Sequence, residues 1–248
     1  MASTSQSVRR AFEVFKLFAS ERRSLSTIEI AESLGAPRSS CAALLKTLFD
    51  LNLLSMDRRA SRYFPTAEFA ELGAWLNADE LYPPNLLSSL EALSAETGET
   101  VTLAAYNDLM IELVDVFSSR QAISFSAEKG QRFAVWRSAL GTAYLTRLDT
   151  AQIRALYKRS LDRRVIANDE IDIENVIETV SQARRAGYAF AKGVVFPDAS
   201  AMACDTGLDN NGRPLIFAIA GPTERMERNE DAFSRRLLDA ATGFTEAS

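Results

Sequence analysis

The sequence predicts an α+β protein with two domains, a small helical N-terminal domain and a larger domain built on an antiparallel sheet. Helical periodicity dominates the chain up to about residue 66. From residue 85 onwards, strand patterns interleave with helical ones, which is typical of helices packed on an antiparallel sheet. Two adjacent prolines, Pro83 and Pro84, interrupt helical continuity between the two parts. We therefore expect domains over 1–66 and 85–248, with a linker helix and hinge over 67–84.

Composition is ordinary for a globular protein. With 248 residues, of which 47% are hydrophobic and 25% charged, the chain is long enough to bury two hydrophobic cores. Its polar start lacks the apolar core of a signal peptide, and no run approaches the roughly 18 apolar residues of a membrane span. We expect a cytoplasmic protein with no membrane partner. The two cysteines, Cys41 and Cys204, fall in different expected domains, which argues against a disulfide scaffold.

The chain contains no histidine. Histidine is the usual general base and the commonest metal ligand, so a zinc site or a serine-histidine triad cannot be built here. The sequence also lacks a glycine-rich phosphate loop and a Gly-x-Ser-x-Gly turn. We therefore expect no catalytic residues, no metal and no cofactor.

Two helices are expected first. The first covers about Gln6 to Ala19 and carries an apolar stripe that we expect to face the other helices, formed by Val8, Ala11, Phe12, Phe15 and Phe18. The second begins after Ser26, which forms a capping box with Glu29 three residues later. Gly35 can adopt the left-handed conformation that ends this helix.

A third helix follows a tight turn, with Pro37 at or near its first position. Its expected core face consists of Cys41, Leu44, Leu45, Leu48 and Leu51. The opposite face carries Arg38, Ser39, Ala42, Ala43, Lys46 and Asp50. A major groove admits small and basic side chains, because bulky ones would keep the helix backbone away from the base edges.

Two short strands are expected at about Leu53–Met56 and Arg62–Phe64, around a tip that contains Arg58 and Arg59. Three helices and such a hairpin predict a winged helix-turn-helix, which binds DNA. The first 66 residues hold ten basic and six acidic side chains, whereas the rest of the chain holds 18 and 27, so the positive field is local to this domain. The alternatives are an ordinary helical hairpin and, for the two arginines, a solvated turn.

The second domain alternates helices with strands. Helices are expected over 86–97, 138–147, 150–158, 172–186 and 231–244, and strands over 100–106, 111–117, 188–195, 201–206 and 214–220. In the first of these strands, Val101, Leu103 and Ala105 share one side, as in a half-buried strand. Asn211 and Gly212 predict a tight hairpin between the last two strands.

Several short motifs are spread over both domains. They include Ser7-Val8-Arg9-Arg10-Ala11, Leu25-Ser26-Thr27-Ile28-Glu29-Ile30-Ala31, Pro37-Arg38-Ser39-Ser40, Glu96-Thr97-Gly98-Glu99-Thr100-Val101, Ala139-Leu140-Gly141-Thr142-Ala143, Arg185-Ala186-Gly187-Tyr188-Ala189 and Ala220-Gly221-Pro222. Over nearly the whole chain, this set resembles the IclR family of bacterial transcriptional regulators. The resemblance implies a winged-helix domain, a linker helix, and a GAF-like domain that binds a small organic effector and helps to assemble homodimers or homotetramers.

The expected partner of the first domain is double-stranded DNA with a palindromic operator, because a symmetric dimer presents two copies of its reading helix. The expected contact residues are Ser26, Thr27, Arg38, Ser39, Ser40, Ala42, Ala43, Lys46, Arg58, Arg59 and Arg62. The family often places an aromatic residue or histidine and then an arginine where this chain has Ala42 and Ala43. Either alanine could contact a thymine methyl group.

The expected effector site consists of Ala139, Leu140, Gly141, Ala191, Ala201, Ala218 and Ala220. Family members that bind small oxo-acids use polar residues at positions that align with Ala191, Ala201 and Ala218. Because alanines leave volume without polar donors, we expect an effector with an apolar or aromatic body, such as a carboxylate held by helix-terminal amides at 139–141. Polar groups could also come from Arg137, Asp205 or Tyr106.

These observations predict a sequence-specific DNA-binding regulator whose operator affinity is controlled by a small organic effector of a catabolic pathway. One alternative is a regulator with a degenerate sensor domain that works through protein contacts alone. Another is a small-molecule enzyme, for which the sequence offers no motif. Repression or activation depends on where the operator lies relative to a promoter, which is a property outside the protein.

Overall fold

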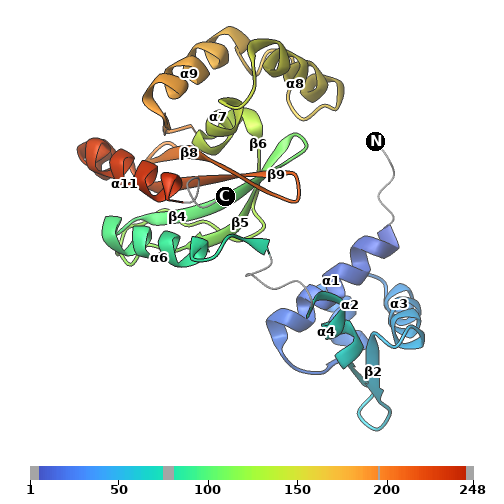
Figure 1. The fold of residues 1–248 in the computed structure, drawn as a ribbon. Helices are drawn as coiled ribbons and strands as arrows, with labels where there is room; N and C mark the ends of the chain where they lie inside the picture. The colour runs from blue at the N-terminus through green and yellow to red at the C-terminus, as the bar shows by residue number, and fades with distance from the viewer. Residues whose placement is uncertain (1–5, 75–80, 195, 244–248) are drawn as a thin grey trace. The chain divides into compact units, whose positions relative to one another are not determined.

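The structure is a computed structural model that describes residues 6–74, 81–194 and 196–243 (Figure 1). The chain divides into two compact units, Met1–Glu80 and Leu81–Ser248. The N-terminal unit contains α1 (Gln6–Glu21), β1 (Leu25–Ser26), α2 (Thr27–Ser33), α3 (Arg38–Asp50), β2 (Leu54–Asp57), β3 (Arg62–Pro65) and α4 (Ala67–Ala74). Its strands form an antiparallel sheet in the order β1-β3-β2. The three helices and the hairpin are those expected of a winged helix-turn-helix.

The buried face of α1 differs from the expected stripe. Phe18 is buried as expected, but Val8 and Phe12 are 56% and 63% exposed. Val14, which lies one turn before Phe18, is fully buried in their place. The helix is therefore rotated relative to the expected stripe, and its core contacts centre on Val14 and Phe18. Phe15 stacks on Phe69 of α4, with ring centroids 3.8 Å apart.

The core face of α3 is confirmed for Cys41, Leu45 and Leu48, which are buried. Leu51 was expected on that face but is 58% exposed, because α3 ends at Asp50. The expected linker helix and hinge covers 67–84. Its first part is helical as α4, and its residues 75–80 lie outside the described residues.

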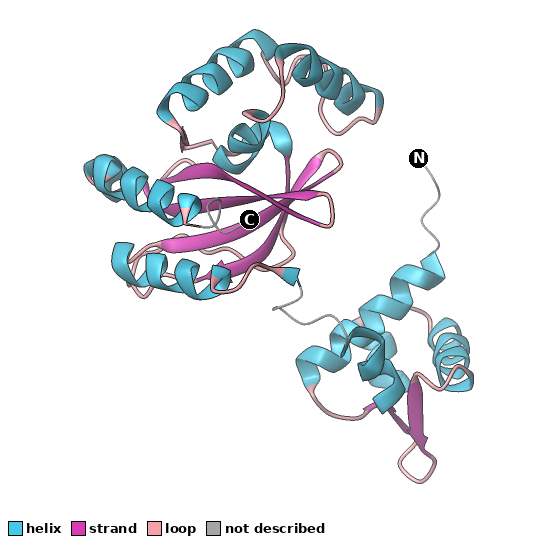
Figure 2. Ribbon diagram, viewed as in Figure 1, coloured by secondary structure: helices cyan, strands magenta, loops and turns pink. Residues whose placement is uncertain are grey.

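The C-terminal unit is a six-stranded antiparallel sheet in the order β6-β5-β4-β9-β8-β7, with helices on both faces (Figure 2). Its strands are β4 (Thr100–Asn107), β5 (Met110–Phe117), β6 (Arg132–Ala134), β7 (Ala189–Lys192), β8 (Ala199–Asn210) and β9 (Arg213–Pro222). Its helices are α6 (Leu86–Thr97), α7 (Ala139–Leu145), α8 (Thr150–Asp162), α9 (Ile173–Ala186), α10 (Thr223–Arg228) and α11 (Glu230–Thr242), with a 3-10 helix at Val135–Arg137. The expected α+β class is confirmed.

The expected elements of this unit are all present, with ends that differ by up to four residues. The expected ends at residues 195 and 244 lie outside the described residues. The hairpin between β8 and β9 turns at Asn211 and Gly212, both with positive φ. Sequence reasoning missed β6, the 3-10 helix and α10, because elements of three to six residues are too short to show a period.

Strand β4 was expected to be half-buried, and this expectation is wrong. Val101 and Leu103 pack against α6 and α11, while Ala104 packs into the core beneath α7. Helices cover both faces of the sheet, so a central strand has no face toward solvent. Residues of β4 that alternate with Val101 and Leu103 therefore face the side that carries α7.

Candidate functional site

The start of α2 is fixed by the expected capping box. The Ser26 hydroxyl accepts from the Glu29 amide at 3.3 Å, and the Glu29 carboxylate accepts from the Ser26 amide at 2.8 Å. Arg23 donates to the same carboxylate at 2.6 Å. Arg23, together with the Ser26 amide, holds the pKa of the Glu29 carboxyl well below its usual range. The turn that follows uses Gly35, whose φ is +56°.

The exposed face of α3 presents the expected residues. Arg38, Ser39, Ser40, Ala42, Ala43 and Lys46 are all exposed. Beneath them, Cys41, Leu45 and Leu48 anchor the helix in the core of the unit. The side chains between Arg38 and Lys46 on this face are small, and these two residues carry positive charge, which suits close approach to a DNA groove. Ser26 and Thr27, at the start of α2, are half-buried.

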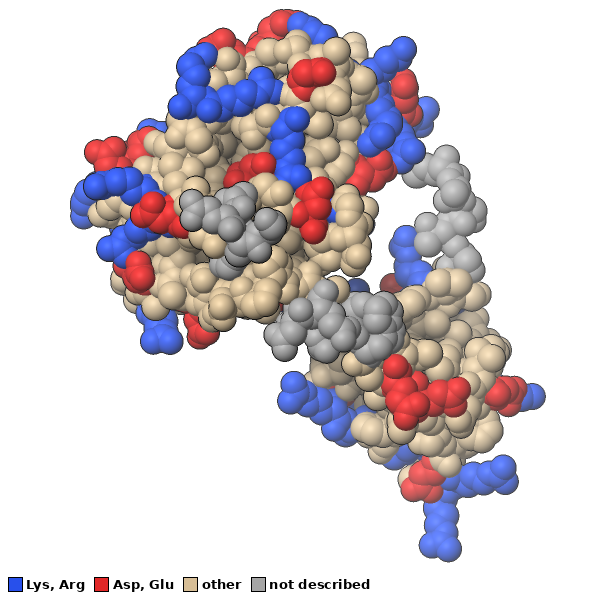
Figure 3. Space-filling view, viewed as in Figure 1, with Lys and Arg blue, Asp and Glu red and all other residues tan. Residues whose placement is uncertain are grey.

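The tip between β2 and β3 is held in a defined turn. The Asp57 carboxylate accepts from the Arg59 amide at 2.8 Å and from the Ala60 amide at 3.2 Å. Arg58 and Arg59 are exposed, and basic side chains project from this end of the N-terminal unit (Figure 3). A well-defined tip with exposed cations is suited to phosphate contact.

Arg62 lies in a different environment from the two tip arginines. Its guanidinium donates to the Ser24 carbonyl at 2.9 Å and to the Glu29 carboxylate at 2.9 Å. The side chain is 32% exposed. It therefore ties β3 to the start of α2, a role that sequence reasoning did not distinguish from DNA contact.

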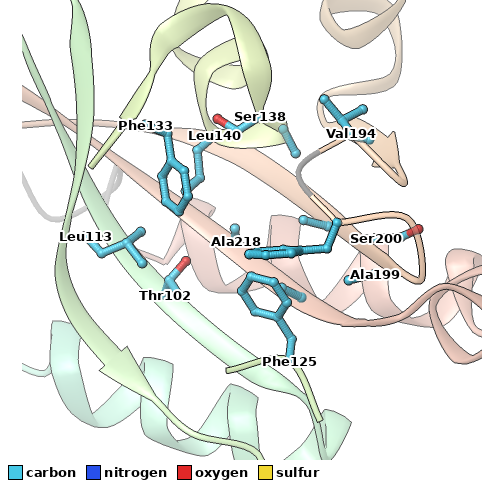
Figure 4. Close-up of a pocket in the computed structure, with 15 residues that line it drawn as sticks. Thr102, Leu113, Phe125, Phe133, Ser138, Leu140, Val194, Ala199, Ser200 and Ala218 are labelled. Carbon is cyan, nitrogen blue, oxygen red and sulfur yellow. The ribbon is translucent and has the colours of Figure 1, made fainter. Parts of the chain in front are cut away.

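The C-terminal unit contains an apolar pocket between the sheet and α7 (Figure 4). It is lined by Thr102, Leu113, Phe125, Phe133, Ser138, Ala139, Leu140, Ala191, Val194, Phe196, Ala199, Ser200, Ala201, Ala218 and Ala220. Its volume, counted out to the open mouth, is about 530 Å³. Antiparallel pairing places Thr102 opposite Ala218 on β9. The small side chains on this face of the sheet leave the space open.

Six of the seven expected effector residues line this pocket, and Gly141 does not. A Cβ atom at Gly141 would lie 1.7 Å from the Val135 carbonyl oxygen, so this position needs glycine for close backbone packing. The Gly141 amide donates to the Ser138 hydroxyl at 3.1 Å. This expected helix-terminal donor is therefore already occupied.

The three polar residues that were expected to provide polar groups to the pocket make contacts elsewhere. Arg137 pairs with Glu170, and Asp205 pairs with Arg147 at 2.7 Å. Tyr106 stacks on Tyr144, with ring centroids 3.8 Å apart. The described lining residues include no charged side chain.

Sequence reasoning missed the aromatic side of the pocket. Phe125 lies in an irregular segment that is held by two hydrogen bonds. The Thr100 hydroxyl donates to the Phe125 carbonyl at 2.7 Å. The Arg225 guanidinium donates to the Ile123 carbonyl at 2.8 Å. A segment without secondary structure has no period that could reveal which side chain points inward. Thr102 could have been found, since it alternates with Val101 and Leu103, had β4 been expected to be buried on both faces.

Comparison with known proteins gives two family matches. Residues 85–245 match the model of the bacterial transcriptional regulator IclR C-terminal domain, and residues 7–58 match that of the IclR helix-turn-helix domain. The chain belongs to the IclR family. It is a DNA-binding transcriptional regulator, and the resemblance expected from its motifs is confirmed.

Curated relatives of this IclR-family chain are regulators. The HTH-type transcriptional regulator TsaQ1/TsaQ2 of Comamonas testosteroni is 24% identical over 89% of this chain and 79% of its own length. The glycerol operon regulatory protein of Streptomyces coelicolor is 30% identical over 76% of this chain and 74% of its own. The transcriptional repressor IclR of Escherichia coli is 24% identical over 98% of this chain and 89% of its own length.

Solved structures show the same fold. An IclR transcriptional regulator from Alicyclobacillus acidocaldarius has a TM-score of 0.64 at 24% identity and covers 97% of both chains. The Thermotoga maritima IclR has a TM-score of 0.65 at 18% identity, over 96% of this chain and 98% of that one. The matching family models and curated relatives are transcriptional regulators, not enzymes.

Two further features concern the described residues alone. Residues 6–74, 81–194 and 196–243 contain no group of three or more His, Cys, Asp or Glu that could hold a metal ion. Nor does any helix in those ranges have the length and apolar character that crossing a membrane requires.

Proposed function

We propose that a small organic effector, bound in the C-terminal pocket, controls how tightly this regulator binds its operator. The pocket carries the proposal, because it is concave and lined mainly by apolar and aromatic side chains with a few hydroxyl groups, which is the usual character of small-molecule sites. The relative from Streptomyces coelicolor is named for a glycerol operon, which supports an effector from a catabolic pathway.

We further propose that the protein binds a palindromic operator as a homodimer or homotetramer, with the exposed face of α3 in the major groove. Ser39, Ala42, Ala43 and Lys46 would reach base edges, and Arg58 and Arg59 would contact phosphates. Arg38 and Ser40 would be presented to the groove on the same exposed face, and Ser26 and Thr27 lie at the start of α2. We expect Arg62 to act by holding the wing, because its guanidinium bonds within the unit.

Selection from random DNA duplexes tests this mode of binding. The full-length protein should enrich a palindromic motif with half-sites about one helical turn, or a multiple of it, apart. A selected pool without two-fold symmetry, or binding no tighter than to competitor DNA, would contradict the proposal.

Alanine substitution of the wing arginines should weaken binding to all DNA sequences alike. Arg58→Ala and Arg59→Ala should each lower the slope of log affinity against log salt concentration by about one for each lost phosphate contact. Arg120→Ala, an exposed arginine of the C-terminal unit, is the matched control and should leave the slope unchanged. Unchanged slopes for both wing variants would show that the wing does not contact DNA.

Ala218→Trp should abolish the response to effector while leaving ligand-free operator binding within about two-fold of the wild type. The indole would occupy the pocket, and the DNA-binding surface lies in the other unit. Ala191→Trp, from the edge strand β7, fills the same space independently and controls for local disruption of β9. Gel-shift titrations with and without ligand measure the response, and an intact response in both variants would place the effector elsewhere.

A further inference from the structure

One wall of the pocket is aromatic and uncharged. Phe125 and Phe196 meet edge to face, with ring centroids 5.6 Å apart, and Phe133 and Leu113 lie on the side of the sheet (Figure 4). The described lining residues offer no cation to balance an anionic ligand. Because moving a carboxylate into an apolar site without a paired cation is costly, this pocket disfavours charged ligands.

Three hydroxyl groups line the pocket, and two of them have partners. The Ser138 hydroxyl accepts from the Gly141 amide at 3.1 Å. The Ser200 hydroxyl shares a hydrogen bond with the Thr223 hydroxyl at 2.9 Å. Both hydroxyls therefore already have a hydrogen-bond partner within the fold, although each keeps further hydrogen-bonding capacity.

The third hydroxyl, that of Thr102, has no hydrogen-bond partner within the part of the chain that the structure describes. Thr102 is 3% exposed, and its oxygen points toward the space between Phe125 and Phe133 (Figure 4). A buried hydroxyl without a partner is unfavourable, and native proteins satisfy nearly all such groups. A polar group at this position would satisfy the hydroxyl.

We propose that the pocket selects an uncharged aromatic molecule with one hydrogen-bonding group, and that this group binds the Thr102 hydroxyl. The inference rests on the proposed function, in which the pocket holds the effector, and it names the chemical class of that effector. The phenyl rings supply shape and apolar contact, and Thr102, the lining hydroxyl without a partner among the described residues, supplies the polar contact that orients the ligand.

Three probes that share an ethylbenzene body separate the chemical classes. Ethylbenzene has no polar group, 4-ethylphenol has a neutral hydroxyl, and 4-ethylbenzoate is an anion at pH 7.5. Isothermal titration calorimetry with the full-length protein should give the tightest binding for 4-ethylphenol and the weakest for 4-ethylbenzoate.

The variant Thr102→Val keeps the shape of the side chain and removes the hydroxyl. It should weaken binding of 4-ethylphenol about three- to ten-fold, as expected for one neutral hydrogen bond, without weakening binding of ethylbenzene. Thr102→Ser should restore the preference for the phenol. Ser200→Ala is the matched control, because its hydroxyl is already bonded to Thr223, and should change the ratio of the two affinities by less than two-fold.

Three results would overturn the inference: tighter binding of 4-ethylbenzoate than of 4-ethylphenol, an unchanged ratio of phenol to hydrocarbon affinity in Thr102→Val, or no saturable binding of any probe. Failure of the proposed function gives a different result. In that case 4-ethylphenol would bind with the expected dependence on Thr102, while operator affinity would not respond to it.

Discussion

Replacing Arg225 with alanine is expected to lower the free energy of unfolding of the C-terminal unit by about 3–5 kcal/mol. The guanidinium donates two hydrogen bonds to the Glu99 carboxylate, at 2.5 and 2.8 Å, and Glu99 is 2% exposed. Removing the cation would leave a buried carboxylate without its charged partner. It would also release the Ile123 carbonyl, which Arg225 bonds at 2.8 Å near the aromatic wall of the pocket.

Urea denaturation followed by circular dichroism measures this effect. Arg228→Ala is the matched control, since Arg228 lies on the same helix but pairs with Glu224 at an exposed site. We expect the control to change the unfolding free energy by no more than about 0.5–1 kcal/mol. Adding Glu99→Gln to Arg225→Ala should recover part of the loss, because it removes the unpaired charge. Equal stability of Arg225→Ala and Arg228→Ala would contradict this account of the buried pair.

Gly141→Ala is expected to destabilise the same unit by about 3 kcal/mol, the upper end of the usual cost of overpacking. The new methyl group would lie 1.7 Å from the Val135 carbonyl oxygen and 2.6 Å from its carbon. Both are backbone atoms, so the 3-10 helix before α7 must move to relieve the clash. Ala139 and Leu140, at the start of α7, line the pocket, so probe binding should weaken as well.

A second glycine-to-alanine change provides the control. Gly73 lies in α4, and a methyl group added there would meet no described atom within 4 Å, so Gly73→Ala should be neutral or slightly stabilising. Thermal melting of both variants gives the comparison. A melting temperature for Gly141→Ala equal to that of the wild type would show that the backbone at Val135 yields without cost.

Local signals explain why the elements of the DNA-binding unit could be predicted. The capping box at Ser26 and Glu29 and the helix end at Gly35 depend on neighbours within one or two turns, and both are present. The orientation of α1 depends on what packs against it, and the sequence does not contain that information locally. Val8 and Phe12 therefore form part of the apolar stripe in the sequence, although both side chains are exposed in the structure.

The pocket residues also divide into those that could be predicted from the sequence and those that depend on tertiary packing. Its alanines were predicted from the resemblance to a family, because they stand where other members have polar residues. Thr102 and Phe125 were not predicted, although both line the pocket. Detecting Thr102 requires knowing that helices cover both faces of β4, and detecting Phe125 requires the tertiary contacts that hold its loop.

The most direct test of effector control is the affinity of 4-ethylphenol for the full-length protein with and without saturating operator duplex. If the ligand changes operator affinity, then by thermodynamic reciprocity the operator must change ligand affinity by the same factor. The account predicts a change in the dissociation constant of about 5–150-fold, corresponding to a coupling of ~1–3 kcal/mol. Equal dissociation constants with and without operator would contradict it.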